Sequence, residues 1–482
     1  MTETQRKPSL IEALIPIIFL IALLSLNVYF FGDATLDGSN QIALILAAGI
    51  AAIVALRVGY RWTHMLDGIV ESISSAMSSI LILLLIGALA GTWLLSGIVP
   101  AMIYYGLEIL NPTIFLFAAC VVSAIVSVAT GSSWSTIATL GIALLGIGQT
   151  LGLGEGVVAG AIISGAYFGD KMSPLSDTTN LAPAMAGTDL FTHIRYMAYT
   201  TIPTFAITLI VFLVWGFMNN SQADIEQIGL VQASIQDKFN INFWLFLVPA
   251  AVIFMIVKKV AAIPALLIGS LLGGVFAIIF QPQVIETISG IQGNLFEASY
   301  KAVMLSMYGD ISITTSNEMV NELLSTGGMA GMLNTIWLIL CAMVFGGIME
   351  STNMLRTITS SIIKLANSTG SLVASTAGTC VFFNITASDQ YLAIVVPGRM
   401  FAETYKERGL KPEVLSRTLE DSGTVTSVLI PWNTCGATQS SVLGVSTWVY
   451  APYCFFNIIS PFMTILFAYL NIKIRRFTDK DK

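Results

Sequence analysis

The sequence predicts an all-α polytopic membrane protein, and three observations lead to this fold class. First, 55% of the 482 residues are hydrophobic, only 10% are charged and the mean hydropathy is +0.81, whereas soluble domains carry about 25% charged residues. Second, apolar runs of about 17 to 25 residues, each long enough to cross a hydrocarbon core, recur from Leu14 to Leu470. Third, polar segments containing proline and acidic residues interrupt several of these runs.

The apolar runs and the positions of Lys and Arg together predict about ten full spans. Cytoplasmic loops are enriched in basic residues, and nearly all of them can face one side here, with Lys238 and Lys301 left on the other. Both chain ends are then cytoplasmic, and the first run is a retained span, because it has no cleavage signature. The cytoplasmic basic residues are Arg6, Lys7, Arg57, Arg61, Arg195, Lys258, Lys259, Arg356, Lys364, those from Arg399 to Arg417 and those from Lys473 to Lys482. The predicted spans are 10–31, 41–57, 74–96, 155–190, 196–218, 242–257, 262–281, 332–350, 412–446 and 448–470.

Two further segments, 112–150 and 370–403, are predicted to be re-entrant hairpins. The placement of the basic residues requires each segment to enter and leave on the same side of the membrane. Each has a polar centre, "VSVATGSSWSTIATLG" in the first and "FFNITASDQYLAIVVPG" in the second. The apolar arms around these centres have about 15 residues, which is short for a crossing.

The chain also overlays on itself as two repeats. A shift of 255 places residues 80–145 on 335–400, so that Ser133 meets Ser388, and a shift of 257 places Pro174 on Pro431. The first copy begins on the cytoplasmic side and the second begins outside, so the repeats have inverted topology, a recurrent plan in secondary transporters. The resulting parts are two N-terminal spans (1–67), repeat 1 (68–218, with hairpin 112–150 and broken helix 155–190), linker loops with two spans (219–322), repeat 2 (323–471, with hairpin 370–403 and broken helix 412–446) and a cytoplasmic tail (472–482).

Each repeat is expected to contain an unwound transmembrane helix. In the first, "KMSPLSDTTNLAP", Pro174 and Pro183 each remove a backbone donor and disturb the preceding turn. The corresponding segment of the second repeat is "SVLIPWNTCGATQS", residues 427–440. Backbone groups freed inside a bilayer cost several kcal/mol each unless protein, water or an ion satisfies them. Freed carbonyls with hydroxyl, amide and carboxylate oxygens suit Na⁺, while half-helix N-termini suit a carboxylate.

Charged residues near these breaks carry the functional prediction, because charges at membrane depth are costly and mark ion or substrate paths. We expect Lys171 to meet Asp177 where the chain unwinds. Competition between H⁺ and Na⁺ for one carboxylate is sufficient for antiport, and the proton carrier is predicted to be Asp177 or Asp170. The proton-coupling candidates are Asp170, Lys171, Asp177 and Asp389.

Three other polar residues admit plainer explanations. Asp421 lies four residues after Arg417, so an ion pair within one helix explains it as well as a functional role does. His64 is expected in a cytoplasmic loop and His193 near an interface, each as an ordinary polar residue.

The two hairpin tips and the two breaks are predicted to enclose one binding site. The predicted ion or substrate ligands are Thr130, Gly131, Ser132, Ser133, Ser176, Asp177, Thr178, Asn180, Thr386, Ser388, Asp389, Asn433 and Thr434. Within this set, Na⁺ is assigned to Ser133, Asp177, Thr178 and Asn180.

Several motifs resemble the NhaC family of sodium/proton antiporters, and the resemblance covers almost the whole chain. They are "EALIP" at 12–16, "TGSSWSTIATLGIALLGIG" at 130–148, "GAYFGDKMSPLSDTTNLAPAMAGTDLFTHIRYM" at 165–197 and "PWNTCGATQSSVLGV" at 431–445. The family includes sodium-coupled malate/lactate antiporters and belongs to a wider ion-transporter superfamily. The resemblance implies inverted repeats, an elevator-type moving domain and a homodimer in the cell membrane.

The sequence therefore predicts a Na⁺/H⁺ antiporter that exports Na⁺ by alternating access. The alternative is a sodium-coupled exchanger of a small organic anion or amino acid. The chain has no HExxH motif and no histidine at comparable depth to activate a serine, so it is not expected to be an enzyme. Its five cysteines lack CxxC spacing, which argues against a zinc site. The expected partners are Na⁺, protons and the lipid bilayer, with no cofactor and no nucleic acid.

Overall fold

The computed structural model of the protein describes residues 6–31, 38–109, 111–218, 225–315, 318–363 and 366–477. Lys364 and tail residues 478–482, for which a cytoplasmic position is predicted, lie outside these ranges. The described chain is mostly helical, as predicted. Its strands, β1 (Ile311–Ser312) and β2 (Ser325–Thr326), form a short antiparallel pair.

One flank of the molecule is formed by helices from both halves of the chain. These are α1 (Leu10–Phe31), α2 (Ser39–Val58), α3 (Trp62–Leu95) and α18 (Leu333–Ser351), which pack on one another. The helix α3 starts twelve residues before the predicted span at residue 74, so His64, which was expected in a loop, is helical. Met65, Ile69 and Ser72 are buried at helical spacing along this extension, although polar residues on its other face lower its mean hydropathy.

The first segment predicted to be a hairpin forms two helical arms joined at Gly131 and Ser132. The outgoing arm is α5 (Pro112–Thr130), and the returning arm consists of α6 (Ser133–Thr136), the π-helical turn η2 (Ile137–Gly141) and α7 (Ile142–Thr150). The Asn111 side chain starts α5 by accepting a 2.9 Å hydrogen bond from Thr113 N, and Gly131, with φ of 71°, ends it. At 19 residues, α5 is longer than the expected arm and long enough to cross a membrane.

Both predicted broken helices are broken in the structure. In the first, α8 (Glu155–Met172) and α9 (Asp177–Ala186) are separated by residues 173–176. In the second, α22 (Pro412–Leu419) runs through the π-helical turn η4 (Glu420–Thr424) and the 3₁₀ turn η5 (Ser427–Leu429) before α23 (Thr434–Leu443) begins. The segment predicted to be the second hairpin lies between the two broken helices in the sequence. It consists of α20 (Thr369–Thr386) and α21 (Leu392–Glu407).

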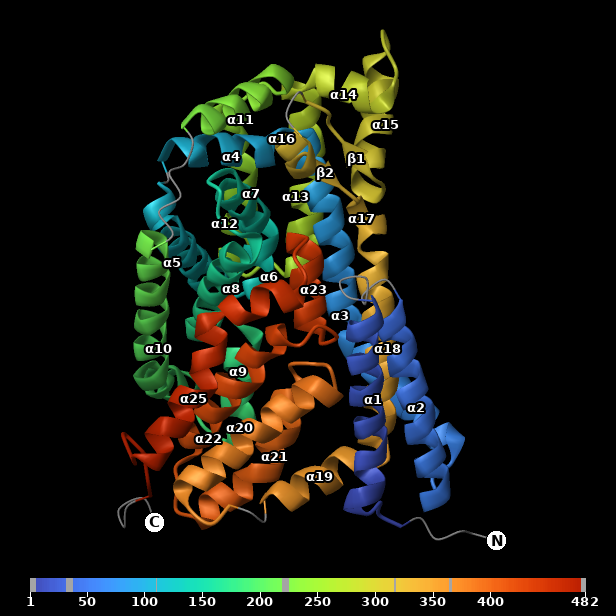
Figure 1. The fold of residues 1–482 in the computed structure, drawn as a ribbon, viewed down its shortest axis with the longest axis vertical. Coiled ribbons are helices and arrows are strands. Elements are labelled where there is room, and N and C mark those ends of the chain that lie inside the picture. The colour runs from blue at the N-terminus through green and yellow to red at the C-terminus, as the bar shows by residue number, and fades with distance from the viewer. Residues whose placement is uncertain are drawn as a thin grey trace.

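The remaining elements surround this assembly. They are α4 (Ile98–Ile109), α10 (Leu190–Met218), α11 (Ile225–Lys238), η3 (Phe243–Phe246), α12 (Leu247–Val257), α13 (Ala262–Phe280), α14 (Pro282–Ser289), α15 (Leu295–Tyr308), α16 (Glu318–Leu323), α17 (Gly328–Gly331), α19 (Met354–Ile363), α24 (Thr447–Tyr450), η6 (Ala451–Tyr453) and α25 (Phe455–Tyr469). The beginning of α1 and the end of α25 lie at the same end of the molecule, opposite α11 and α14 (Figure 1).

Helices long and apolar enough to cross a membrane recur along the described chain. Seven meet this description, and two bent pairs raise the number to as many as nine. The seven are 10–31, 39–58, 62–95, 112–130, 190–218, 262–280 and 328–351, and the bent pairs are 228–238 with 243–257 and 447–453 with 455–469.

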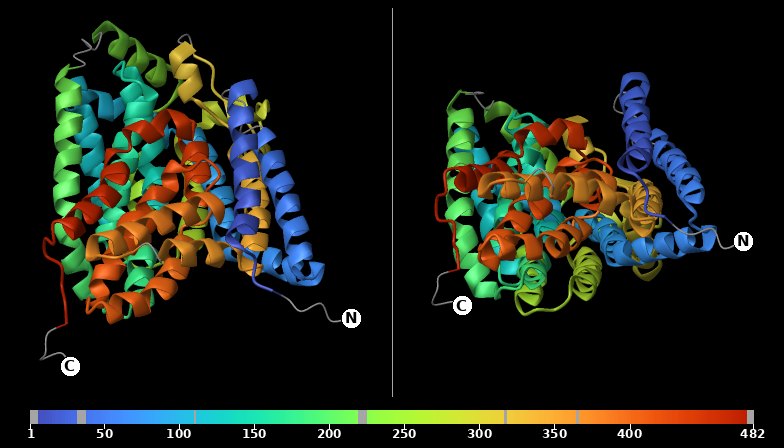
Figure 2. Two further views of the ribbon diagram at one scale, coloured as in Figure 1. Left: turned by 60° about the horizontal axis from the view of Figure 1, so that its bottom comes forward. Right: turned by 90° about the horizontal axis from the view of Figure 1, so that it is seen from below.

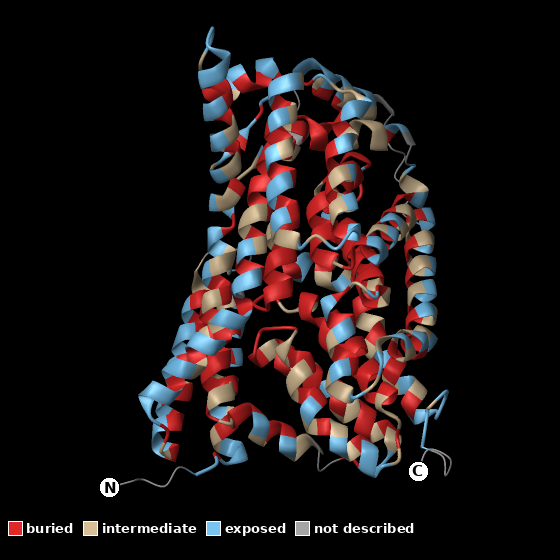
Figure 3. Ribbon diagram, turned by 180° about the vertical axis from the view of Figure 1, so that it is seen from behind, coloured by how far each residue is buried: buried red, intermediate tan, exposed pale blue. Residues whose placement is uncertain are grey.

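The hairpins and broken helices lie between two flanks. In Figure 2, α10 runs along one flank and α1, α2 and α18 run along the other, with α20 and α21 between them. The outer helices carry stripes of exposed residues, whereas the interior is largely buried (Figure 3). Exposed side chains on α10 include Ile202, Ile210 and Phe217, as expected for a helix that faces lipid.

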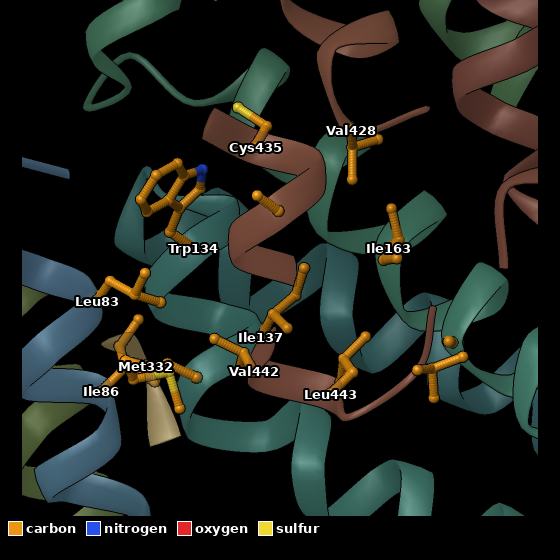
Figure 4. Packing of buried hydrophobic residues seen from close by; sticks show 14 of the residues in the cluster. Leu83, Ile86, Trp134, Ile137, Ile163, Met332, Val428, Cys435, Val442 and Leu443 are labelled. Carbon is orange, nitrogen blue, oxygen red and sulfur yellow. The ribbon is translucent and has the colours of Figure 1, made fainter. Parts of the chain in front are cut away.

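The returning arm of the first hairpin packs directly on the second broken helix. Figure 4 shows Ile137 of η2 beside Val442 and Leu443 of α23. This apolar contact brings the polar ends of α6 and α23 into one region of the molecule.

Candidate functional site

The tip of the first hairpin holds the acidic end of α8. The Oδ2 atom of Asp170 accepts hydrogen bonds from the backbone N of Ser133 at 3.1 Å and from its Oγ at 2.7 Å. Gly131 makes this approach possible, because a Cβ there would lie 2.6 Å from Leu175 Cβ and 2.9 Å from Ser176 N. Tip and break of the first repeat therefore fit together as one unit.

The break between α8 and α9 is lined with hydroxyl groups. Ser176 caps α9 by accepting a hydrogen bond from Thr179 N at 3.4 Å, and its Oγ lies 3.1 Å from Thr178 Oγ1. Thr179 Oγ1 donates to the carbonyl oxygen of Lys171 at 3.0 Å. The side chains therefore satisfy backbone groups that the missing turn would leave free.

Lys171 joins the two broken helices through a buried ion pair. Its Nζ contacts Asp421 Oδ1, both side chains are fully buried, and Nζ also donates to Ser460 Oγ at 3.1 Å. Thr200 Oγ1 donates to the second carboxylate oxygen of Asp421 at 2.9 Å. The expected pairings of Lys171 with Asp177, and of Asp421 with Arg417, are therefore wrong. Both expectations considered neighbours in sequence, whereas the actual partner lies 250 residues away.

A second contact between the broken helices involves Glu420, which the sequence prediction missed. Glu420 is fully buried in η4, and its Oε1 accepts a 3.0 Å hydrogen bond from Thr178 Oγ1. Its Oε2 is buried without a hydrogen-bond partner among the described residues. Because π-helical turns inside α-helices occur frequently at functional sites, both the side chain and its backbone setting mark this position.

The second hairpin meets the second break in a similar way. The backbone N of Thr434 donates to the carbonyl oxygen of Ser388 at 2.9 Å. Asp389 Oδ1 accepts from Tyr391 N at 2.9 Å and from Leu392 N at 3.1 Å. Asn433 caps α23 through Cys435 N at 3.0 Å and donates to the backbone oxygen of Asn384 at 3.1 Å. Asp389 thus holds the beginning of the returning arm.

Three other predicted ligands form hydrogen bonds within their own segments. Thr130 Oγ1 lies 3.2 Å from Thr136 Oγ1, and Ser132 Oγ accepts from Ser135 N at 3.1 Å. Thr386 Oγ1 donates to Phe382 O at 2.8 Å.

Asp177 and Asn180 are exposed, unlike the buried Ser133 and Thr178 with which the Na⁺ assignment groups them. Asn180 Nδ2 donates to Pro174 O at 3.0 Å and to Ser176 O at 2.7 Å. Within the described ranges, no three His, Cys, Asp or Glu residues form a cluster able to hold a metal ion.

Arg417 is a further buried charge close to this region. Its side chain is fully buried, none of its three guanidinium nitrogens has a hydrogen-bond partner in the described structure, and it stacks over Tyr196 with 4.5 Å from Cζ to the ring centroid. His193 of α10 is also fully buried, with Nδ1 2.8 Å from Ser416 Oγ, and its place near an interface stays a prediction. Both residues pack where α10 contacts α22.

The sequence does contain a signal for Glu420 as well as for Asp421. Glu420 and Asp421 are adjacent within the predicted span 412–446, and two acids inside a span call for a functional explanation. Proximity to Arg417 offers a local explanation for Asp421. No local pattern connects either acid to Lys171 or Thr178.

Comparison with known proteins identifies the family. The model of the Na+/H+ antiporter family matches residues 165–472, which include the break of the first broken helix, the second hairpin and the whole second broken helix. The chain is 37% identical to a malate-2H(+)/Na(+)-lactate antiporter of Bacillus subtilis, over 96% of this chain and 95% of that protein. It is 37% identical to the Na(+)/H(+) antiporter NhaC of Alkalihalophilus pseudofirmus, over 90% and 91%, and 35% identical to the arginine/ornithine antiporter ArcD of Halobacterium salinarum, over 98% and 94%. The chain therefore belongs to the Na⁺/H⁺ antiporter family.

Proposed function

We propose that this protein exchanges cytoplasmic Na⁺ for external H⁺ across the cell membrane. The observation that carries this proposal is the contact of both broken helices around buried carboxylates, with the first hairpin tip bound to Asp170 and Lys171 bound to Asp421. A buried carboxylate without a bound cation must take up a proton or a metal ion. Alternate binding of the two gives exchange, and the NhaC relatives are named for it.

Asp170 is the better placed of the two proton carriers that the sequence suggests. It is buried and joins the hairpin tip to the break, whereas Asp177 is exposed at the start of α9. We assign the exchange site to Asp170, Ser133 and Thr178. Asp177 serves as the outer ligand that receives the ion.

The architecture proposed for this activity is two inverted repeats with about ten full spans, two hairpins and cytoplasmic ends. This proposal is supported by a contact that occurs in both halves of the chain. In each half, the tip of the hairpin contacts the break of the helix that follows it. The hairpins and broken helices would move together as an elevator against α1, α2, α3 and α18. We propose that two such chains form a dimer.

Purified protein in sealed vesicles tests this function. An imposed Na⁺ gradient should drive proton movement in the opposite direction, followed with a trapped pH dye. Asp170→Asn should abolish the flux, and Asp177→Asn should raise the Na⁺ concentration needed for half-maximal flux. Wild-type vesicles without Na⁺-driven proton movement would rule the proposal out, and full flux in Asp170→Asn would rule out the assigned site.

A second candidate function is Na⁺-coupled exchange of a small carboxylate or amino acid. The observation that favours it is Arg417, a buried guanidinium whose nitrogens have no partner in the described residues, because guanidinium groups match carboxylates in geometry and charge. The similarity to a malate/lactate antiporter and an arginine/ornithine antiporter agrees with it. Vesicles loaded with labelled malate, lactate or arginine distinguish the two functions. Na⁺-dependent release of one of these compounds, lost in Arg417→Met, would favour the organic substrate.

A further inference from the structure

We propose that a pocket on the surface of the molecule, at the beginning of α8, binds the ammonium group of a phosphatidylethanolamine headgroup. The pocket has a volume of about 680 Å³. Its walls come from residues 152–157 at the start of α8, from the end of α10 and from the segment formed by α24 and η6. None of the residues assigned to ion exchange lines this pocket, so the inference does not depend on the proposed transport function.

The pocket opens at the end of a helix that faces lipid. The 29 residues of α10 are enough to cross a membrane, and the helix ends at Met218, which lines the pocket. The exposed fractions of Phe217 and Met218 are 62% and 79%. Because the end of a membrane-spanning helix lies where lipid headgroups meet water, the mouth of the pocket is at headgroup depth.

Two aromatic rings in the pocket can receive a cation. Trp215 and Tyr453 both line it, and their ring centroids are 5.6 Å apart with an angle of 81° between the ring planes. An ammonium group is attracted to the face of an aromatic ring, and most strongly to that of tryptophan. Because both rings belong to one pocket, a single headgroup can contact both.

Glu155 supplies the negative charge that an ammonium group requires. Its side chain lies in the first turn of α8, is exposed and forms no hydrogen bond or ion pair with another residue in the described part of the chain. None of the described residues that line the pocket is lysine or arginine. An ammonium group therefore meets a carboxylate acceptor and no opposing charge, whereas an anionic headgroup would meet the carboxylate without a basic partner.

Close packing beneath the pocket holds its binding groups in place. The helix α8 lies so near η6 that a Cβ at Gly160 would be 2.5 Å from Tyr453 Cβ. At Gly156, a Cβ would be 2.5 Å from the carbonyl oxygen of Val449. Glycine permits these contacts, and a larger residue would push the two segments apart. The backbone positions of Glu155 and Tyr453 are thus set by the fold, which lowers the entropic cost of binding a ligand.

The surroundings of the pocket indicate a lipid as the source of the ammonium group. Ile210, Val214 and Met218 are all exposed and follow one another at a spacing of four residues, so they form an apolar stripe along α10. Acyl chains can lie on this stripe while the headgroup occupies the pocket. Phosphatidylserine also carries an ammonium group, but its additional carboxylate would face Glu155, and phosphatidylethanolamine has no such group.

Native mass spectrometry of the whole protein tests this inference without a transport assay. Delipidated protein in detergent receives phosphatidylethanolamine or phosphatidylglycerol, and the dissociation constant of the first bound lipid is measured. We expect phosphatidylethanolamine to bind the wild type more tightly, and Glu155→Gln and Trp215→Leu each to weaken it about threefold to fivefold. Glu286→Gln and Trp244→Leu are the matched controls, because they change exposed residues that do not line the pocket.

Reversal of the charge provides a further variant at an exposed position. Glu155→Lys should bind phosphatidylglycerol more tightly than phosphatidylethanolamine, and a size-exclusion profile equal to that of the wild type shows that the variant is folded. Equal affinities of the wild type for the two lipids, an unchanged preference in Glu155→Lys, or an unchanged affinity in folded Trp215→Leu overturns the inference. Displacement of the lipid by millimolar ethanolamine would assign the pocket to a soluble ammonium compound and would overturn the lipid source.

Discussion

At the scale of single residues, the site is made by contacts between segments that are far apart in the chain. The tip motif and the Asp170 segment could each be predicted, because hydroxyls and acids inside apolar runs stand out. The partner of Lys171 could not, because nothing in the local sequence distinguishes Asp421 from an acid that pairs with Arg417. The arrangement of side chains between two segments is a property of the tertiary fold.

Removing Lys171 should leave a buried acid without its counterion. Lys171→Met is expected to lower stability by about 3–5 kcal/mol, because the charge on Asp421 stays buried. Adding Asp421→Asn should restore much of this loss, since the asparagine carries no charge. Both effects are measured by heating the protein in detergent and using size-exclusion chromatography to quantify the protein that remains folded at each temperature. Lys238→Met removes the exposed 3.3 Å pair with Asp237 and should change stability by less than about 1 kcal/mol. Equal losses in both lysine variants would contradict this account.

Ser133→Ala should weaken Na⁺ binding while the protein stays folded. It removes the 2.7 Å hydrogen bond to Asp170 Oδ2 and leaves the backbone contact from Ser133 N. A hydrogen bond to a charged group contributes about 1.5–3 kcal/mol, so the KM for Na⁺ is expected to rise about tenfold or more. Ser25→Ala on α1, where Oγ bonds only to Ile21 O among the described residues, is the control. An unchanged KM in Ser133→Ala would remove this serine from the site.

At the scale of elements, proline residues and polar composition predict both helix breaks. The start of α3, in contrast, is determined by which residues are buried. α3 begins at Trp62 because one face of its first turns is buried, and hydropathy averaged over both faces conceals this. No residue pattern in the sequence predicts the π-helical turns η2 and η4.

The junction between the first hairpin and the first break should be sensitive to one methyl group. Gly131 and Gly187 both have positive φ, 71° and 84°, so alanine costs about 1–2 kcal/mol at either position. Only at Gly131 would the added Cβ also meet Leu175 and Ser176, since nothing lies within 4 Å at Gly187. Gly131→Ala should therefore lose Na⁺-driven flux that Gly187→Ala keeps, measured at matched protein levels in vesicles. Similar Na⁺-driven fluxes in the two variants would show that transport does not require the close contact between Gly131 and the first helix break.

At the scale of the whole molecule, both ends of the described chain lie on one side (Figure 1). Introduced cysteines can test this orientation directly, because the five native cysteines are all buried. Cysteines placed at the exposed positions Lys7 and Lys473 should react with an impermeant maleimide only after the membrane is opened. A cysteine at the exposed Gln283 of α14, at the opposite end, should react in intact cells. Labelling of Lys7→Cys and Lys473→Cys from opposite sides would contradict the fold.

The ion pair between Lys171 and Asp421 also has a consequence for how the protein is made. The two residues are 250 positions apart, and a ribosome adding about 5–20 residues per second needs roughly 12–50 s to span that distance. Throughout this interval the newly inserted first half carries a lysine whose acid has not yet been synthesised. The first broken helix therefore completes its folding only after the second has entered the membrane, so biogenesis of the site is a late event that requires the nearly complete chain.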